Sequence, residues 1–353
     1  MNWVWLVLIG VGYDWMTLMW LKRWLVPLKG GAPSVPVTIF RPLKRGVPEI
    51  GMKLRSFLQA VQPDDQILIA VYEDDILTKN EARAALADFP LLDVQIISCR
   101  SDAALNPKIN KLLQLAPLAR CDHWIVLDSE FLDAATFLPQ FRFEWNSLQF
   151  PVLSAPYRFR KLTLSTAPVL HTLLPGLAVL QRFGKIANTL GAALAVTRSQ
   201  IEKLGGWESL AYELAEDFQL GHRLAAMGVP VRLSRAVVTL DNDPASLVSS
   251  LGQLHRISAT YRRCQPAGFA GSIVLHSVTW SLFLAVFHPF GWIGFLLASL
   301  SRIIVCQQRA RALGWPISYG RWLLIPISSL LETVFWIAAW LPLPVHWAGR
   351  RFK

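Results

Sequence analysis

Carboxylate side chains gather at three points of the sequence, each beside a hydrophobic stretch. The segments are "VYEDD" (71–75), "LDSE" (127–130) and "ELAEDFQLGHRL" (213–224). Carboxylates that a fold holds in place can bind a divalent cation or accept a proton during catalysis. Taken singly, each segment also has a structural explanation: a solvated loop, a polar turn that caps the next helix, or acids that a helix dipole favours.

Asp128 and Glu130 are the candidate metal ligands. They follow "WIVL" (124–127), a short apolar run that predicts a buried strand. The two-residue alternation of a strand predicts that both side chains lie on the same side of it. Two oxygen ligands at this position suit Mg²⁺ or Mn²⁺, itself held to a diphosphate.

Asp217 is the candidate general base. Read as a helix, its segment places Asp217 on the same face as Leu220, Gly221 and Leu224, near the apolar stripe. Burial and the like charge of Glu216 both predict a raised pKa for this pair of acids. A carboxylate with a raised pKa is suited to accept a proton near neutral pH.

Apolar strands alternate with helices along the middle of the chain. The predicted strands are 35–40, 66–72, 93–99, 123–129, 151–157, 191–197 and 236–241, and the predicted helices are 49–61, 79–88 and 106–118. Asn106 and Pro107 form a helix-start signal for the last of these helices. The pattern predicts an α/β domain with a parallel sheet covered on both faces. In such sheets ligands bind beyond the carboxyl ends of the strands, where the first two acidic segments lie.

Hydrophobic residues make up 53% of the chain and are concentrated near its ends. Residues 3–20 form an apolar run of the length that spans a bilayer, and they predict a signal anchor. Three more apolar stretches follow at 268–287, 292–306 and 322–341, and the second is short enough to be re-entrant. We therefore divide the chain into an anchor (1–22), a linker (27–34), an α/β domain (34–246), an amphipathic interface helix (247–266) and a C-terminal membrane region (267–353).

The charge excess follows the same division. There are 35 Lys and Arg against 24 Asp and Glu, a formal net charge of +11, and the basic residues cluster beside the apolar stretches. This pattern is typical of a cytoplasmic membrane face that binds anionic lipid, so it predicts an outside N-terminus and a cytoplasmic domain. It argues against nucleic acid as a partner, because no aromatic reading motif is interleaved. The basic tail "GRRFK" conflicts with three full C-terminal spans, so either one stretch does not cross or the tail is an exception.

Two other classes of function are disfavoured. The four cysteines (99, 121, 264 and 306) have no metal-site spacing, and in a cytoplasmic domain we expect them to be reduced packing residues. A transporter needs charged residues inside its spans, and only Asp14, Arg302 and Glu332 qualify.

Taken together and in this order, the motifs resemble membrane glycosyltransferases of families 2 and 21, ceramide glucosyltransferases especially; bacterial relatives include hopanoid glycosyltransferases. The resemblance covers most of the chain. It rests on the second and third acidic segments together with "TIFRPLKRG" (38–46), "NPKINKLLQ" (106–114), "GAALAVTR" (191–198), "LGGWES" (204–209), "QLHRI" (253–257) and "WAGRRFK" (347–353).

The resemblance implies a GT-A-like domain, a Rossmann-like fold that binds a nucleotide sugar, and it implies roles for named residues. Asp217 would be the general base, with Glu216 in support. Asp128 and Glu130 would hold the metal on the diphosphate of a UDP-sugar.

The remaining roles concern the nucleotide and the acceptor. Glu73 or Asp74 would contact the uridine, and the sequence does not choose between them. Lys108 would face the nucleotide, while Gln253 and Arg256 would bind it through the family's Gln-x-x-Arg-Trp motif. The tryptophan of that motif is Ile257 here, so Tyr261, one helical turn later, is the candidate aromatic on the acceptor side.

The activity implied is the inverting transfer of a hexose, glucose first, from a UDP-sugar to a lipid hydroxyl, as in glycolipid and sphingolipid biosynthesis. It would take place at the cytoplasmic face of a bacterial inner membrane. Two alternatives stay open: a different acceptor such as a hopanoid polyol, and a catalytically impaired membrane protein that keeps the fold. The oligomeric state is not predicted.

Overall fold

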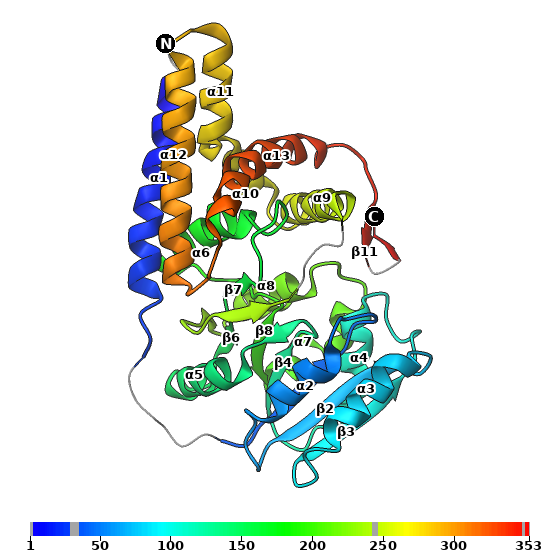
Figure 1. Cartoon of the computed structure of the whole chain (residues 1–353). Helices are drawn as coiled ribbons and strands as arrows, with labels where there is room; N and C mark the ends of the chain where they lie inside the picture. The colour runs from blue at the N-terminus through cyan, green and yellow to red at the C-terminus, as the bar shows by residue number, and fades with distance from the viewer. Residues whose placement is uncertain (1–2, 29–34, 242–245, 348–349, 353) are drawn as a thin grey trace. The chain divides into compact units, whose positions relative to one another are not determined.

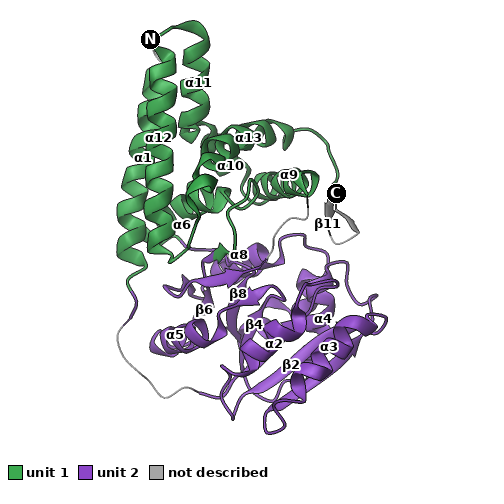
Figure 2. Ribbon diagram, in the orientation of Figure 1, with its two compact units in different colours: residues 1–26, 158–185, 242–353 green, residues 27–157, 186–241 purple. Residues whose placement is uncertain are grey.

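The computed structural model describes residues 3–28, 35–241, 246–347 and 350–352, with side chains as far as Val345. Most of the expected linker, and the side chains of the C-terminal motif, lie outside the described residues. The chain forms two compact units (Figure 2): a sheet unit of residues 27–157 and 186–241, and a helical unit of residues 1–26, 158–185 and 242–353. Residues 158–185, which we had placed in the continuous domain 34–246, therefore group with the helical unit.

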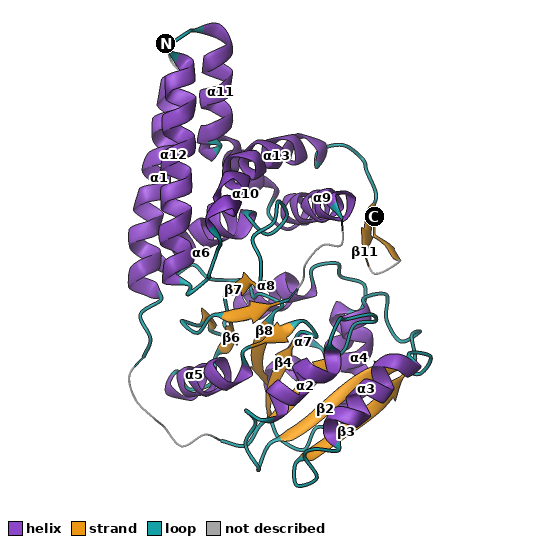
Figure 3. Ribbon diagram, in the orientation of Figure 1, coloured by secondary structure: helices purple, strands orange, loops and turns teal. Residues whose placement is uncertain are grey.

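A seven-stranded sheet forms the centre of the sheet unit (Figure 3). Its strand order is β3-β2-β1-β4-β8-β6-β9. The bounds are β1 Thr38–Pro42, β2 Gln66–Tyr72, β3 Asp93–Cys99, β4 His123–Leu127, β6 Val152–Ser154, β8 Ala193–Thr197 and β9 Val231–Leu233. The prediction of a wholly parallel sheet is wrong, because β8 runs antiparallel to both β4 and β6. The four strands β3, β2, β1 and β4 are parallel, and this half carries the strand ends of interest.

Buried apolar side chains explain why these segments form central strands. Every residue of β2 is buried, as is every residue of β1. Such runs without alternation are expected where a sheet is covered on both faces. The strand expected at 236–241 lies elsewhere, as β10 (Val238–Leu240) of a three-stranded sheet with the order β5-β10-β7, in which β5 is Phe131–Leu132 and β7 is Tyr157–Phe159.

The helices of the sheet unit are α2 Ile50–Leu58, α3 Ile76–Leu86, α4 Pro107–Leu115, α5 Ala134–Ser147, α7 Arg198–Leu204 and α8 Glu216–Ala226. The predicted start of α4 is confirmed. The Asn106 Oδ1 accepts hydrogen bonds from the main-chain N–H groups of Lys108 (2.9 Å) and Ile109 (3.2 Å), with Pro107 as the first helical residue. This cap satisfies donors that a helix start otherwise leaves unpaired.

The helical unit contains α1 Trp3–Trp24, α6 Leu174–Arg182, α9 Leu247–Cys264, α10 Pro266–Gly271, α11 Ser277–Phe287, α12 Gly291–Ala312 and α13 Leu324–Ala338, followed by a hairpin of β11 Val345–Trp347 and β12 Arg350–Phe352. Within this unit α1 lies against α6, α11 and α12 (Figure 1). A π-helical turn at Val169–Leu173 precedes α6.

Among the residues that the structure describes, two helices are long and apolar enough to cross a membrane, Trp3–Trp24 and Tyr319–Ala338. A third candidate is the pair Pro266–Leu275 and Ser277–Phe287, which is bent by 49° at its break. The stretch expected at 292–306 is part of the continuous helix α12, which is not among the candidates in the described part of the chain. The predicted N-terminal apolar helix is present, and the structure supports fewer candidate spans than the four apolar stretches of the sequence.

Candidate active site

The site is built where the strand order of the sheet reverses. The chain leaves β1 to form β2 and β3 on one side, and it returns to form β4 on the other side. In doubly wound sheets this switch point opens a crevice at the carboxyl ends of the strands, where ligands bind. The loop after β2 carries Glu73 and Asp74, and the turn after β4 carries Asp128 and Glu130.

Lys108 joins two of the three acidic segments. Its Nζ donates hydrogen bonds to the Asp128 Oδ1 and to the main-chain oxygen of Gly191, both at 2.7 Å, and lies 3.8 Å from the Glu216 Oε1. The side chain is 14% exposed, so the ammonium group needs these oxygens in place of water. Burial alone would lower the pKa of Lys108, but the charges of Asp128 and Glu216 hold it above its ordinary value.

Asn106 holds the third acidic segment against the first turn of α4. Its Nδ2 donates to the Glu216 Oε2 and to the main-chain oxygen of Glu213, both at 2.9 Å. One amide therefore caps α4 and positions the carboxylate that begins α8. Arg223 supports the same loop by binding the Ser209 main-chain oxygen (2.7 Å) and the Glu213 carboxylate.

Asp217 lies on the first turn of α8, half-buried beside the chain that enters β8. Its Oδ1 accepts a hydrogen bond from the main-chain N–H of Phe218 (2.8 Å). Its Oδ2 faces Gly191, because a Cβ built on that glycine would lie 3.0 Å from this oxygen and 3.5 Å from the Lys108 Nζ. A glycine at 191 thus lets the carboxylate and the lysine approach the backbone closely.

The pKa values of the two adjacent acids are raised, as the sequence predicted. Burial and then the charge of Asp217 raise the pKa of Glu216 to about 7, against the pull of Lys108. Burial also raises the pKa of Asp217, and the positive charge of Lys108 opposes this shift. Because the two groups interact, they titrate as a pair, and the pair is suited to hold or accept a proton near neutral pH.

The Asp128–Glu130 segment is a turn, not a strand. β4 ends at Leu127, and the Phe131 N–H donates back to the main-chain oxygen of Asp128 (3.2 Å). The alternation that we used to place both carboxylates on one side therefore does not apply. The Lys44 Nζ lies 3.0 Å from the Glu130 Oε1, and the Glu130 side chain is 15% exposed. Burial raises the pKa of Glu130, while Lys44 opposes that shift.

Arg41 supports this turn from inside the sheet. It is fully buried in β1, and its guanidinium lies 5.0 Å from the ring centroid of Phe57 and 5.5 Å from that of Phe131. Its Nη1 donates to the main-chain oxygen of Asp128 at 2.7 Å. Burial lowers the pKa of Arg41 to about 10, so it stays charged at neutral pH.

A divalent cation fits the donor set of this turn in part. Asp128 is one-third exposed, with Lys108 on only one of its oxygens, and carboxylate oxygens are the donors that Mg²⁺ and Mn²⁺ prefer. Among the described residues no three His, Cys, Asp or Glu side chains form a metal-binding group. The described residues would thus supply at most two such side chains to one cation.

The three acids of the first acidic segment make different contacts. Asp75 caps α3 by accepting a hydrogen bond from the Thr78 N–H (3.3 Å). Asp74 is exposed and binds the Arg45 Nη2 at 2.5 Å, and this hydrogen bond lowers its pKa. Glu73 is exposed, and its main-chain N–H donates a hydrogen bond to the main-chain oxygen of Cys99. The uridine role of Glu73 or Asp74 stays a prediction.

The structure does not bring Gln253, Arg256 and Tyr261 into the same unit as the acidic residues. They lie on α9 of the helical unit, which begins with a capping box formed by Ser246 and Ser249. Tyr261 is 37% exposed, and Gln253 and Arg256 are half-buried. Their roles stay predictions.

Sequence reasoning missed three residues that build the site. From the sequence, Asn106 is expected as a cap, Gly191 as part of a strand and Arg41 as a basic residue near the anchor, and all three lie in family motifs; no contact with the acidic residues is predicted for any of them. The cap signal and the glycine before a strand were visible, but their contacts with Glu216 and Asp217 join positions far apart in the sequence.

Comparison with known proteins identifies the family. A sequence model described as glycosyl transferase family 21 matches residues 3–353. The chain belongs to glycosyl transferase family 21. The family-level prediction of a transferase is confirmed.

A curated relative of this family 21 chain is also named as a glycosyltransferase. Over 60 residues the chain is 43% identical to the probable glycosyltransferase YdaM of Bacillus subtilis (strain 168). This alignment covers 17% of this chain and 14% of that protein. The matched segment is thus a small part of that relative's length.

Solved structures show the fold. The mannosyltransferase PcManGT from Pyrobaculum calidifontis, in complex with GDP-Man and Mn²⁺, aligns over 95% of this chain and 97% of that chain, with a TM-score of 0.56 and 16% identity. GalNAc-T7 with UDP, GalNAc and Mn²⁺ aligns over 66% of this chain and 51% of that chain, with a TM-score of 0.44 and 12% identity. The alignment with the mannosyltransferase confirms the predicted GT-A-like fold.

Proposed function

We propose that this family 21 chain is an inverting glycosyltransferase that moves a hexose, glucose first, from a UDP-sugar to a hydroxyl group of a membrane lipid. The observation that carries the proposal is the convergence of Asp128 and Glu216 on Lys108, with Asp217 beside it, at the switch point of a GT-A-like sheet. Apolar helices long enough to cross a membrane support a lipid as acceptor.

The residues divide the reaction as follows. Asp217 accepts the proton of the acceptor hydroxyl, and the oxygen of that hydroxyl bonds to the anomeric carbon of the sugar. The bond from that carbon to the diphosphate oxygen breaks on the opposite face, which inverts the configuration. A divalent cation held by Asp128 and Glu130 would neutralise charge on the leaving diphosphate. Lys108 positions the carboxylates of Asp128 and Glu216. The guanidinium group of Arg256 is proposed to bind the diphosphate as well.

The proposal includes a location. The basic residues beside the apolar helices support a multi-pass protein of a bacterial inner membrane, with the sheet unit in the cytoplasm and α9 at the anionic membrane surface as an interface helix.

The test is an assay of the purified full chain with a panel of UDP-sugars and lipids, including ceramide and a hopanoid polyol. We expect transfer from a UDP-hexose to a hydroxylated lipid, with an inverted anomeric product. Absence of transfer to every lipid, from a protein that binds UDP, would overturn the proposed function.

The metal has its own test. EDTA should abolish transfer, and Asp128→Asn should lose more activity than Glu130→Gln, because Asp128 is the more exposed carboxylate. Full activity of Asp128→Asn in excess chelator would contradict the metal assignment.

A further inference from the structure

Four arginines are buried among the residues that the structure describes: Arg41, Arg142, Arg302 and Arg309. A guanidinium group stays charged at neutral pH, so its removal from water is costly unless a carboxylate and hydrogen-bond acceptors take the place of the water. Three of these arginines have a carboxylate partner, and the packing of their own unit accounts for them.

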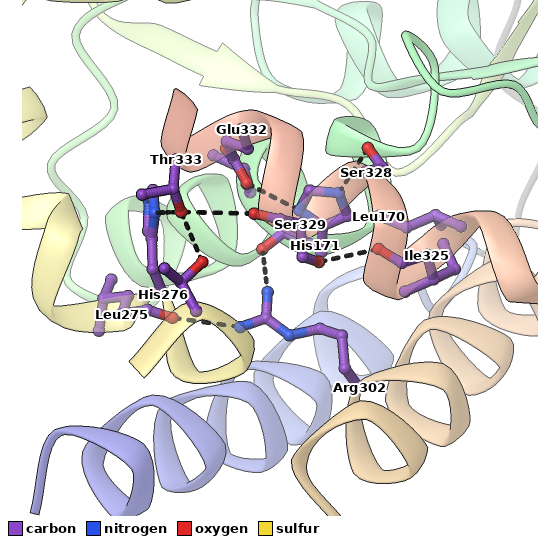
Figure 4. A network of polar contacts seen from close by, with 12 residues as sticks. Leu170, His171, Leu275, His276, Arg302, Ile325, Ser328, Ser329, Glu332 and Thr333 are labelled. Atoms are coloured by element: carbon purple, nitrogen blue, oxygen red, sulfur yellow. Dashed lines mark hydrogen bonds and ion pairs between the residues drawn. The ribbon is translucent and has the colours of Figure 1, made fainter. Parts of the chain in front are cut away.

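The compensated arginines lie in both units. In the sheet unit, Arg142 pairs with the buried Asp65. In the helical unit, Arg302 and Arg309 pair with Asp14 at 2.8 Å and 3.2 Å. Arg302 also donates to the main-chain oxygens of His171 and Leu275 (Figure 4). These charges are balanced where they lie.

Arg41 is the exception. It is fully buried, and among the described residues no carboxylate forms an ion pair with it. Its Nη1 donates to the main-chain oxygen of Asp128 at 2.7 Å, while its Nε and Nη2 have no hydrogen-bond partner in the described part of the chain. The rings of Phe57 and Phe131, with centroids 5.0 Å and 5.5 Å from the guanidinium carbon, compensate the charge only in part.

Stability does not explain a charge at this position. β1 lies between β2 and β4, and every residue of it is buried. A buried ion is often no more stabilising than an apolar side chain of the same volume. An unbranched apolar residue would therefore suit the interior at position 41 at least as well, and the charge itself needs another reason.

The charge lies against the candidate metal-binding turn. The bond from Arg41 to the main-chain oxygen of Asp128 places the guanidinium beside the backbone of this turn. Each carboxylate of the turn already has a lysine, because the Lys108 Nζ lies 2.7 Å from the Asp128 Oδ1 and the Lys44 Nζ lies 3.0 Å from the Glu130 Oε1. Arg41 thus adds a positive charge that neither carboxylate requires.

The sign of this charge favours some ligands over others. It repels a free divalent cation and attracts a diphosphate. In a nucleotide sugar each phosphate of the diphosphate carries one negative charge, and a divalent cation offsets both. Because salt screens a buried charge much less than an exposed one, Arg41 acts on ligands held by the turn without touching them.

We propose that Arg41 disfavours the binding of a free divalent cation to Asp128 and Glu130 and favours a cation that arrives together with a nucleotide diphosphate. Arg41 is then a positioning residue that acts through its charge and through the backbone of Asp128. The inference goes beyond the proposed function and rests on it in one respect, the diphosphate of the donor.

The test measures two affinities of the purified full chain, and neither needs turnover. Mn²⁺ binding to the protein alone is followed by the EPR signal of the free ion, and UDP binding in EDTA is followed by calorimetry. Arg41→Met removes the charge and keeps an unbranched side chain. It should bind Mn²⁺ about three- to tenfold more tightly and UDP about three- to tenfold more weakly, because one positive charge is lost near both ligands.

Two variants are the controls. Arg41→Lys keeps the charge, so both affinities should stay within about twofold of the unmodified chain. Arg55→Met makes the same substitution on α2 of the sheet unit, where the guanidinium is partly exposed and pairs with Asp88 at 2.7 Å, so it should change neither affinity. If Arg41 only held the turn in place, Arg41→Met would weaken both ligands, and opposite shifts therefore identify the effect of charge.

The remaining outcomes overturn the inference. Loss of both affinities in Arg41→Met does so, as does no change in either. If Arg41→Met does not fold, Arg41→Gln, which keeps a donor for the Asp128 oxygen but no charge, takes its place. The unmodified chain gives a second measurement: it should bind Mn²⁺ more tightly when UDP is present, and equal Mn²⁺ affinity with and without UDP contradicts the inference.

The same measurements separate the inference from the proposed function. Opposite shifts in a chain that transfers sugar to no lipid contradict the proposed function alone. Normal transfer by a chain whose Arg41→Met variant has unchanged affinities contradicts the inference alone. A chain that binds no UDP contradicts both.

Discussion

At the scale of single residues, Lys108 is the centre of the candidate active site. Asp128, Gly191 and Glu216 come from three separate segments of the chain, and all three place an oxygen within 3.8 Å of its Nζ. The positive charge of Lys108 therefore offsets part of the negative charge of Asp128, Glu216 and Asp217. This balance of charges sets the protonation of Glu216 and Asp217.

The first prediction concerns the proposed base. Asp217→Asn keeps the side-chain size but cannot accept the proton, so it should lose about 10²–10⁴ in turnover, the usual contribution of general-base catalysis. UDP binding, measured in parallel, should persist. Glu216→Gln should lose less, because Asn106 holds this carboxylate in a supporting position. Near-normal turnover of Asp217→Asn together with an inactive Glu216→Gln would show that Glu216 is the general base and Asp217 the supporting acid.

The second prediction concerns the pH profile. The raised pKa of the Glu216–Asp217 pair should place the acid limb of kcat/KM above the ordinary carboxyl range of about 4. Lys108 lowers the pKa of both acids, so Lys108→Met should move this limb to higher pH. A limb that stays in place, or that moves to lower pH in folded protein, would show that Lys108 does not control the pair.

At the scale of elements, close packing around α8 positions the base. Gly221 faces the segment that leads into β8, and a Cβ at this position would lie 2.5 Å from the Thr189 main-chain nitrogen. The Thr189 hydroxyl also binds the main-chain oxygen of Asp217 at 2.5 Å. The glycine thus allows α8 to approach the backbone that carries Gly191.

The third prediction tests this contact. Gly221→Ala should destabilise the protein by about 1–3 kcal/mol, the usual cost of overpacking, although alanine favours helices. Gly176→Ala in α6 is the control: nothing lies within 4 Å of its Cβ, so it should be neutral or stabilising. Thermal unfolding of both variants decides the matter, and equal melting temperatures would contradict the close approach.

At the scale of the whole molecule, the chain combines a sheet unit with a largely helical unit that includes apolar helices. The net charge of +11 and the basic residues beside the apolar stretches of the sequence support the membrane location proposed above. Of the four cysteines, Cys99 and Cys306 are buried, and Cys121 and Cys264 are half-buried.

The fourth prediction is the orientation in the membrane. Ala103 is exposed on the sheet unit, so Ala103→Cys in a variant without the four native cysteines should react with a membrane-impermeant reagent only after the cells are opened. An epitope tag before Met1 should be accessible on intact cells. Labelling of Ala103→Cys from outside would reverse the orientation and remove access to cytoplasmic UDP-sugar.

Several local features of this protein can be predicted from short patterns in its sequence. The cap at Asn106, the buried runs of β1 and β2, the helix that carries Asp217 and the apolar N-terminal helix all follow from patterns within a few residues. The family motifs, because they keep their order along the chain, were sufficient to predict the GT-A-like fold and family 21. Such features depend on short-range geometry, which a single sequence displays.

The contacts between residues that are distant in the sequence could not be predicted and are seen in the three-dimensional structure. It reversed the direction of β8, ended β4 before Asp128, and assigned residues 158–185 to the helical unit. It also brought Lys108 to Gly191 and His171 to Glu332. These contacts depend on how strands pair and helices pack across large separations in the chain, and the local pattern of either partner is compatible with many such pairings.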